Sequence, residues 1–164
     1  MTVFVIADTH FYHTGMLRFR RFSYIEQMND YIVRAWNSVV LPGDTVVHLG
    51  DFAYTKDQRR LDYIVSRLNG TIMLLRGNHD SADRLCDAGI AVATQSFVPY
   101  ENLLLSHKPI YPKNKHLVNL HGHLHKQQLR GKHINACIDI AGYIPIPIQQ
   151  YINQANQILR RKNV

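Results

Sequence analysis

Five short apolar runs in the sequence are each followed by Asp, Asn or His. The runs cover residues 3–7, 46–49, 71–75, 103–105 and 117–120, and the polar groups after them are Asp8-Thr9-His10, Gly50-Asp51, Gly77-Asn78-His79-Asp80, Ser106-His107 and His121-Gly122-His123. A short apolar run bounded by turn residues is typical of a buried strand. Open α/β sheets bind ligands at the carboxyl ends of their strands. One such ending has little weight, whereas five in order predict a single site.

These side chains have the chemistry of metal ligands. Asp, Asn and His offer oxygen and nitrogen donors, and no Cys joins them. That donor set favours Mn²⁺, Fe, Zn²⁺, Co²⁺ or Ni²⁺ over a Cys-rich structural zinc site. The chain also contains ten His, more than solubility or packing requires, which strengthens the prediction of a metal centre.

In this order, the polar groups resemble the motifs of the calcineurin-like metallophosphoesterase superfamily. That pattern is Asp-x-His, Gly-Asp, Gly-Asn-His-Asp/Glu, His, and finally Gly-His-x-His or His-x-His. The matching residues run from 8 to 123, about three quarters of the chain. Phe52-Ala53-Tyr54 follows Asp51 in place of the Arg-Gly ending of protein Ser/Thr phosphatases. The resemblance is therefore to the small bacterial or phage-type members.

The resemblance implies a centre of two divalent metal ions, with Mn²⁺ expected first and Fe, Zn²⁺, Ni²⁺ or Co²⁺ as alternatives. One ion would be held by Asp8, His10, Asp51 and His123, and the other by Asp51, Asn78, His107 and His121. Two metals about 3.5–4 Å apart can clamp the attacking and leaving oxygens of a phosphoryl transfer. A hydroxide bridging them would attack phosphorus. His79 would stabilise the transition state or protonate the leaving oxygen, and Gly122 would let its two neighbouring His reach different metals.

The loop after His10 interleaves basic and aromatic residues and could hold substrate. Within it, His13 and Arg20 are the candidates for contact with phosphate, because related small phosphoesterases resemble this stretch. The alternative is a structural loop pinned by Phe19 and Phe22, with its arginines in solvent.

Several other polar residues have two interpretations. His125 could line the site or lie in a surface loop, and Asp80 could orient His79 or cap the helix that follows. Asn37 could point toward the site, but a helix cap is preferred. His48 is expected in the core, and packing is favoured for Asn135 and Cys137. We expect His116 and His133 at the surface.

Helices and strands alternate in the first half of the chain, and strands dominate the second. Helices are expected at residues 23–39, 57–68, 81–88 and 148–160, with a capping box formed by Ser23 and Glu26. Strands are expected at residues 2–7, 45–49, 71–75, 91–99, 102–106, 117–120 and 133–140. Together with the resemblance, this predicts an α/β fold in which helices flank two facing sheets, a four-layer α/β/β/α sandwich.

Length and composition indicate one globular domain, residues 1–164. No apolar run is long enough to cross a membrane, and no signal sequence precedes the first strand, so a cytoplasmic protein is expected. Cys86 and Cys137 form no CxxC motif and are expected to be buried free thiols. The net charge of +7 either favours anionic substrates, including nucleotides or nucleic acid, or reflects a generally basic surface.

The leading prediction is therefore a metal-dependent phosphohydrolase acting on a phosphate ester, with a phosphodiesterase preferred. The preference rests on the basic surface and on a compact chain without an insertion large enough for a capping domain. A phosphomonoesterase and a nuclease are alternatives on the same site. A non-catalytic scaffold of the same fold, as in the retromer subunit of this superfamily, is disfavoured because His79 and every ligand position are filled. The oligomeric state does not follow from the sequence.

Overall fold

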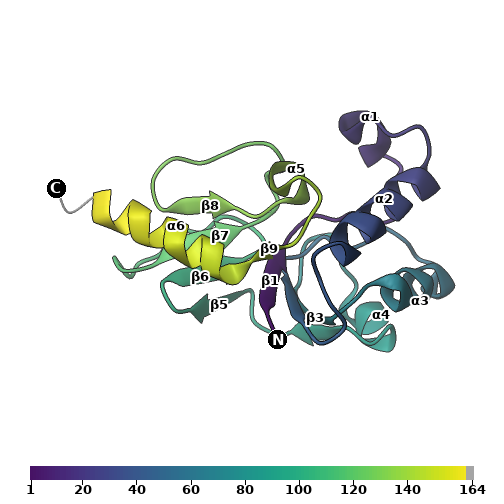
Figure 1. The fold of residues 1–164 in the computed structure, drawn as a ribbon, viewed down its shortest axis with the longest axis horizontal. Helices are drawn as coiled ribbons and strands as arrows, with labels where there is room; N and C mark the ends of the chain where they lie inside the picture. The colour runs from purple at the N-terminus through teal and green to yellow at the C-terminus, as the bar shows by residue number, and fades with distance from the viewer. Residues whose placement is uncertain (162–164) are drawn as a thin grey trace.

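The structure is a computed structural model that describes residues 1–161. Its first sheet has the strand order β4-β3-β2-β1-β9 (Figure 1). The strands are β1 (Val3–Ile6), β2 (Thr45–His48), β3 (Thr71–Leu75), β4 (Ala91–Ala93) and β9 (Ile146–Pro147). Neighbours among β1 to β4 run parallel, and only the short β9 pairs antiparallel with β1. The carboxyl ends of β1, β2 and β3 therefore lie along one edge of the sheet.

The second sheet has the order β5-β6-β7-β8. It consists of β5 (Phe97–Tyr100), β6 (Leu103–Ser106), β7 (Val118–His121) and β8 (His133–Asn135). The hairpin of β5 and β6 is antiparallel, as expected, while β6, β7 and β8 are parallel. His107 and His121 accordingly lie at neighbouring strand ends.

Helices cover the first sheet on its outer face. The helices of this half are α1 (Met16–Arg20), α2 (Ile25–Asn37), α3 (Gln58–Arg67) and α4 (Ala82–Asp87). Met28, Ile32 and Trp36 of α2 and Leu61 and Ile64 of α3 pack with Phe4 and Ile6 of β1 in one buried cluster. Spacing of three or four residues places these apolar side chains on one helix face, which explains why α2 and α3 form where they do.

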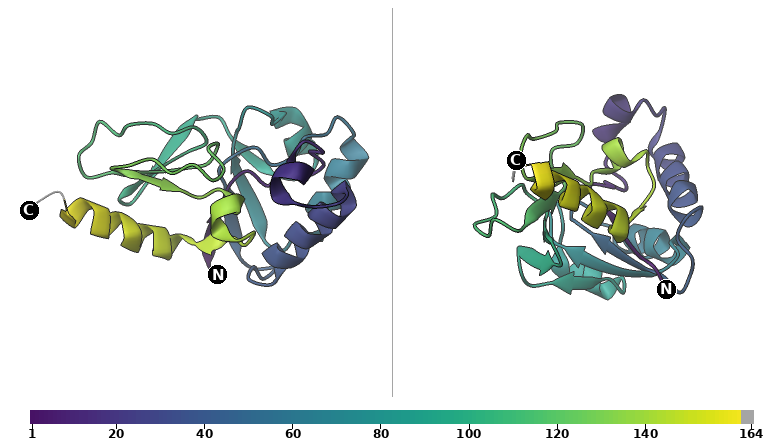
Figure 2. Two further views of the ribbon diagram at one scale, coloured as in Figure 1. Left: turned by 90° about the horizontal axis from the view of Figure 1, so that it is seen from above. Right: turned by 60° about the vertical axis from the view of Figure 1, so that its left-hand side comes forward.

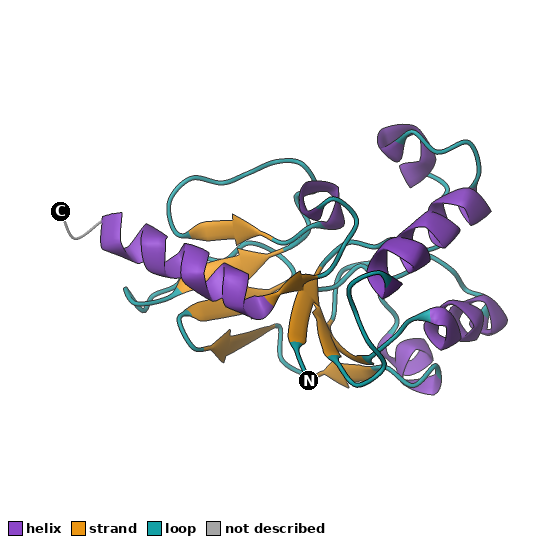
Figure 3. Ribbon diagram, viewed as in Figure 1, coloured by secondary structure: helices purple, strands orange, loops and turns teal. Residues whose placement is uncertain are grey.

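A second apolar cluster fills the space between the sheets. Val5, Ala7, Leu49 and Leu75 from the first sheet meet Leu103, Leu105, Val118 and Leu120 from the second. The long α6 (Ile148–Arg161) joins this cluster through Ile148, Tyr151 and Ile152. Figure 2 shows α6 on the half of the molecule opposite α2 and α3, and Figure 3 shows the strands between them. The predicted fold class, two sheets with flanking helices, is confirmed.

Backbone hydrogen bonds tie the two sheets together beside the strand ends. The Ala7 N–H donates to the Ala136 carbonyl (3.1 Å), and the Ala7 carbonyl accepts from Ile138 (2.9 Å). Ala136 in turn donates to the His121 carbonyl (2.7 Å). The end of β1 is thereby held against the ends of β7 and β8, so the polar groups of both sheets face a shared space.

Several predicted boundaries are wrong. Residues 91–99 divide between β4 in one sheet and β5 in the other, because β4 pairs with β3 and the chain must bend to reach β6. Residues 133–140 end as a strand at Asn135 and turn into α5 (Ile138–Ala141). The strand at residues 71–75 has the predicted bounds but is not wholly buried, since Thr71 and Met73 face solvent.

Four side-chain predictions are also wrong. The cap of α2 is Tyr24, and the Ser23 N–H bonds to Gln27 instead of forming a capping box with Glu26. Asn37 joins α2 to the end of α3, donating to the Arg67 carbonyl and accepting from the Asn69 N–H. Cys86 is exposed, while Cys137 is buried. His133 is buried with its ring 4.6 Å from that of Tyr111, whereas His116 is exposed as expected.

Candidate metal centre

The turns after β1 and β2 are joined by their backbones. Asp8 donates to the Gly50 carbonyl (2.9 Å), and His10 donates to the Asp51 carbonyl (3.0 Å). Asp8, His10 and Asp51 all adopt left-handed backbone conformations, with φ of 60°, 51° and 56°. Such conformations are unfavourable for residues with a Cβ, and they gather at functional sites that the surrounding structure holds in place. Their concentration at these strand ends indicates a functional site.

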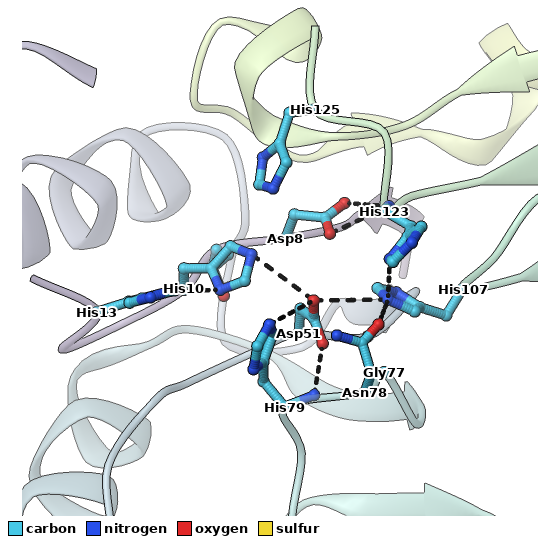
Figure 4. A network of polar contacts seen from close by, with 12 residues as sticks. Asp8, His10, His13, Asp51, Gly77, Asn78, His79, His107, His123 and His125 are labelled. Carbon is cyan, nitrogen blue, oxygen red and sulfur yellow. Dashed lines mark hydrogen bonds and ion pairs between the residues drawn. The ribbon is translucent and has the colours of Figure 1, made fainter. Parts of the chain in front are cut away.

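The carboxylate of Asp51 lies in the middle of the polar side chains that follow the strand ends (Figure 4). Its Oδ2 is 3.5 Å from Nε2 of His107, 3.7 Å from Nε2 of His10 and 3.9 Å from Nε2 of His79. Its Oδ1 accepts a hydrogen bond from the His79 N–H (2.9 Å). One carboxylate is therefore approached by three imidazoles from three different strand ends.

A second set of donor atoms converges on His107. Its Nδ1 is 2.8 Å from the Leu49 carbonyl, which can only accept, so Nδ1 carries the proton in the neutral ring. Burial lowers the pKa of His107 and so favours that neutral form. The remaining lone pair on Nε2 then faces Oδ1 of Asn78 at 3.1 Å and Nδ1 of His123 at 3.2 Å. Acceptor lone pairs this close to one another repel. A metal cation bound between them would stabilise the arrangement.

Two further ring nitrogens support the same conclusion. His121 directs Nδ1 to the Gly122 carbonyl (2.8 Å), which leaves Nε2 as a buried acceptor. Among the described residues, neither this Nε2 nor Nε2 of His10 has a hydrogen-bond partner. Buried polar atoms are nearly always satisfied in folded proteins, so these orphaned nitrogens fit a metal centre.

Asp8 is the other central carboxylate. Both of its oxygens accept from the His123 N–H, at 3.0 and 2.8 Å, which joins the turn after β1 to the turn after β7. Burial raises the pKa of Asp8 to about 7, despite the opposing hydrogen bond from His123. A divalent cation would offset the cost of burying the Asp8 carboxylate charge, so Asp8 is also suited to be a metal ligand.

The observed grouping differs in detail from the predicted ligand sets. Ligand atoms of Asp8, His10 and His125 lie within 4.8 Å of one another, as do those of Asp51, His107 and His123. His125, for which the sequence left two interpretations, therefore lines the centre, its ring stacked 5.3 Å from that of His10. The donor set fits two divalent ions, and the assignment of each residue to one ion stays a prediction.

Two glycines permit the close approach of these turns. A Cβ on Gly77 would lie 2.3 Å from both N and Oδ1 of Asp51. A Cβ on Gly122 would lie 2.5 Å from Oδ2 of Asp8 and 2.6 Å from Cβ of Ala7. Both contacts are far inside van der Waals distance. Gly122 is therefore required by the space beside Asp8, a reason that its spacing between two His did not reveal.

Asp80 has neither of the two roles suggested by the sequence, which were to orient His79 or to cap the following helix. Its carboxylate accepts three backbone hydrogen bonds, from Asp51 (2.7 Å), Phe52 (2.9 Å) and Gly77 (2.9 Å). It neither caps α4, whose N-cap is Ser81, nor bonds to the His79 ring. Asp80 instead fastens the turn after β3 to the turn after β2, and so holds the backbone on both sides of Asp51.

His79 and His13 lie at the open rim of the centre. Nδ1 of His13 is 3.2 Å from Nδ1 of His10, and the His79 ring is 5.7 Å from that of His13. Tyr54, which sequence analysis did not single out, completes this wall with its ring 4.5 Å from His13 and 5.3 Å from His79. His48 is buried as expected, between Thr9 Oγ1 (3.0 Å) and the Gly50 N–H (3.2 Å).

Arg20 lies beneath the candidate metal centre and is not on the solvent-facing surface of the loop that follows His10. Its side chain is fully buried and forms a two-pronged ion pair with Asp139, at 2.9 and 3.0 Å. It also donates to the carbonyls of Thr9 (2.7 Å) and Asp8 (2.6 Å). With its donors directed to these groups, Arg20 in this conformation holds the turn that carries Asp8 and His10, and its contact with a substrate phosphate stays a prediction.

Asp139 connects Arg20 to the far side of the centre. Its Oδ2 is 2.9 Å from Nδ1 of His125 and accepts from the Cys137 thiol (3.3 Å). Burial alone would raise the pKa of Asp139, but the hydrogen bonds from His125 and Arg20 more than offset it and hold that pKa well below its ordinary value. Nothing in the sequence near Asp139 indicates this role, because Arg20 lies 119 residues away in the chain. Asn135, expected to pack, fastens the His125 loop by donating to the carbonyls of His125 and Gln127.

This combination of fold and donor set defines a metal-dependent phosphoesterase. The chain belongs to the calcineurin-like phosphoesterase family, whose model matches residues 1–159. Members of this family bind divalent metals and hydrolyse phosphate esters, so the resemblance seen in the motifs and the predicted class of enzyme are confirmed.

Two other proteins are similar to this chain in sequence or in fold. The chain is similar to "Uncharacterized protein MJ1445" of Methanocaldococcus jannaschii, with 28% identity over 162 residues, 89% of this chain and 86% of that protein. Its fold is similar to the crystal structure of a protein of unknown function, AQ665, from Aquifex aeolicus. That likeness has a TM-score of 0.74 at 24% identity and covers 93% of this chain and 98% of the other. Among the described residues, the helices are too short or too polar to cross a membrane.

Proposed function

We propose that this phosphoesterase is a phosphodiesterase, acting as a single domain. The observation that carries the proposal is a pair of pockets on either side of Asp51. One, of about 480 Å³, is lined by Tyr54, His79 and Arg84, and the other, of about 280 Å³, by Asn78, His107 and Lys108. Figure 4 places His79 on one side of Asp51 and Asn78 with His107 on the other. A phosphodiester has two organic substituents, and each would have its own pocket.

The residues that would hold the metal ions are Asp8, His10, Asp51, Asn78, His107, His121 and His123. When bound, the metals would supply a nucleophile active at neutral pH and stabilise charge on the phosphoryl oxygens. Mn²⁺ is proposed as the working ion from the resemblance to the family, and the oxygen and imidazole donors are compatible with it.

His79 is the proposed catalytic residue of the chain itself. Its backbone is fixed by the bond to Asp51 Oδ1, while its ring stands at the rim of the larger pocket. From there the imidazole can donate a proton to the leaving oxygen. His13 lies beside it and is proposed to orient the substrate, together with the Tyr54 ring.

The preference for diesters can be tested by filling one pocket. Because His79 stands on the leaving-group side, the pocket beside Asn78 and His107 would take the substituent that stays on phosphorus, which a monoester lacks. Ser96 lines that pocket and is exposed, so Ser96→Trp should fill it at little cost to folding. After chelation and return of Mn²⁺, we expect the native enzyme to hydrolyse bis(p-nitrophenyl) phosphate with a higher kcat/KM than p-nitrophenyl phosphate. Ser96→Trp should lower activity on the diester far more than on the monoester.

Ser66→Trp is the matched control, because Ser66 is exposed on α3 and lines neither pocket. It should retain both activities. A native enzyme that prefers the monoester, or equal losses on both esters in Ser96→Trp, would overturn the diester assignment.

A further inference from the structure

The charge of the chain is divided very unevenly along its length. Residues 1–101 contain ten Lys and Arg against eleven Asp and Glu, whereas residues 102–164 contain nine Lys and Arg and one acid, Asp139. That acid is buried against Arg20. The net charge of +7 therefore arises entirely from the part of the chain that follows β5. A generally basic surface does not account for such segregation.

Two loops concentrate this charge beside the metal centre. The basic loops, residues 108–116 and 124–132, carry Lys108, Lys113, Lys115, Lys126, Arg130 and Lys132. The first follows His107 directly, and the second follows His123. All six cationic residues are exposed except the half-buried Lys132. Both loops thus begin at proposed metal ligands and lead away from them.

The basic loops are fixed against one face of the second sheet. Ile110 donates to Oδ1 of Asn119 on β7 (2.8 Å), and Asn135 on β8 bonds to the carbonyls of His125 and Gln127. The two loops also touch each other, through a bond from Lys132 Nζ to the Lys115 carbonyl. Their charges are consequently held side by side on one surface.

Exposed aromatic rings accompany the charges. Tyr111 is 80% exposed and its ring is fixed edge-to-face against His133. Phe19 is 42% exposed, lies 4.8 Å from Nζ of Lys126 and meets the edge of His125. Cationic side chains that follow a phosphate backbone, combined with aromatic rings on which bases stack, are the features that bind single-stranded nucleic acid.

We propose that the basic loops bind single-stranded nucleic acid and lead it into the metal centre. The inference deepens the proposed phosphodiesterase function, on which it rests, by naming the substrate class. The strand enters through the pocket that contains Lys108, since this pocket lies between the first basic loop and Asn78 with His107. A duplex hides its bases from Tyr111 and Phe19, and inorganic polyphosphate has none, so a single strand fits the surface best.

Binding can be measured without hydrolysis, in excess chelator, by the fluorescence anisotropy of a labelled single strand of about 12 nucleotides. The test variant is Lys113→Ala/Lys115→Ala/Arg130→Ala, and the matched control, Arg34→Ala/Arg59→Ala/Arg60→Ala, removes three exposed cations from α2 and α3. Each lost phosphate contact lowers the slope of log K against log salt by about 0.7. The loop variant should therefore bind at least about tenfold more weakly, with a slope reduced by about 2, and the control should bind as the native protein does.

A second pair of variants tests the aromatic part. Tyr111→Ala should weaken binding of the strand by about tenfold, and Tyr111→Phe should retain it, because stacking requires only the ring. The proposal would be overturned if the loop variant and the control bound the strand equally weakly, or if Tyr111→Ala bound it with native affinity. It would also be overturned if the native protein bound inorganic polyphosphate of equal charge as tightly as the strand.

Hydrolysis separates this proposal from the function on which it rests. With Mn²⁺, the loop variant should hydrolyse bis(p-nitrophenyl) phosphate at the native rate and lose kcat/KM only on the single strand. Absence of diester hydrolysis in the native enzyme would refute the phosphodiesterase, whereas native diester hydrolysis combined with native strand cleavage in the loop variant would refute the binding surface alone.

Discussion

Replacing Arg20 by Ala distinguishes a structural arginine from one that binds substrate. The Arg20 guanidinium makes four hydrogen bonds, two to the Asp139 carboxylate and one each to the carbonyls of Asp8 and Thr9. The side chains of Arg20 and Asp139 are both fully buried. Arg20→Ala would thus remove two hydrogen bonds to a buried carboxylate and two to the turn that carries two proposed metal ligands.

The size of the effect follows from the burial. Removing one partner of a buried ion pair costs about 3–5 kcal/mol, because the other charge is left uncompensated. His125 remains 2.9 Å from Asp139 and can still donate, which favours the lower end of that range. A loss of about 3 kcal/mol is a large fraction of the 5–15 kcal/mol that stabilises a typical domain. Arg20→Lys should lose less, since it keeps the charge but not the two-pronged geometry.

Urea denaturation in chelator measures this free energy without a contribution from bound metal. Arg21→Ala is the control, because the adjacent Arg21 is exposed, and its free energy of unfolding should stay within about 0.5 kcal/mol of the native value. We also expect Arg20→Ala to bind Mn²⁺ more weakly, since its turn carries Asp8 and His10. A stable Arg20→Ala protein with full metal content and a raised KM would refute this reasoning and return Arg20 to the role of a phosphate ligand.

Three other predictions test the centre. Asp51→Asn should lose more metal and more activity than any other single ligand substitution, because Asp51 is approached from three strand ends, and full hydrolysis by chelator-treated native enzyme would contradict the need for metal. His79→Ala should keep its metals and lose about 10²–10⁴-fold in rate on nucleoside or alkyl esters. The loss on nitrophenyl esters should be much smaller, because their leaving group needs little protonation. Equal losses on both ester types would indicate charge stabilisation instead, and loss of metal would make His79 a ligand. In chelator, the raised pKa of Asp8 (about 7) means that the folded state holds a proton more tightly than the unfolded state, so its contribution to stability is complete below about pH 4 and is lost as the pH rises to about 7. The native free energy of unfolding should accordingly fall relative to that of Asp8→Asn across this window, by at most about 4 kcal/mol, and parallel curves would disprove the assignment.

The sequence by itself determined the fold class and the position of each polar group at a strand end. Apolar runs of three to five residues define buried strands through local composition, and Asp8, Asp51, Asn78, His107 and His121 each follow such a run within three residues. The helices at 58–67 and 148–161 were also predictable, because their apolar residues recur at helical spacing. Where a strand changes sheets, as at residues 94–96, local pattern contained no information about which partner the backbone would choose.

Only the tertiary structure decided the roles of residues whose partners are distant in the chain. Arg20 could be placed at a phosphate or in the core until its pairing with Asp139, 119 residues away, was known. Asp80 fastens a turn 28 and 29 residues before it, and Gly122 is required by Asp8, at the other end of the site. A residue's type and neighbours specify what it can donate, accept or bury, but its actual partner depends on which strand ends the fold brings together. For this reason the donor set was visible in the sequence, while the groups that hold it in place were not.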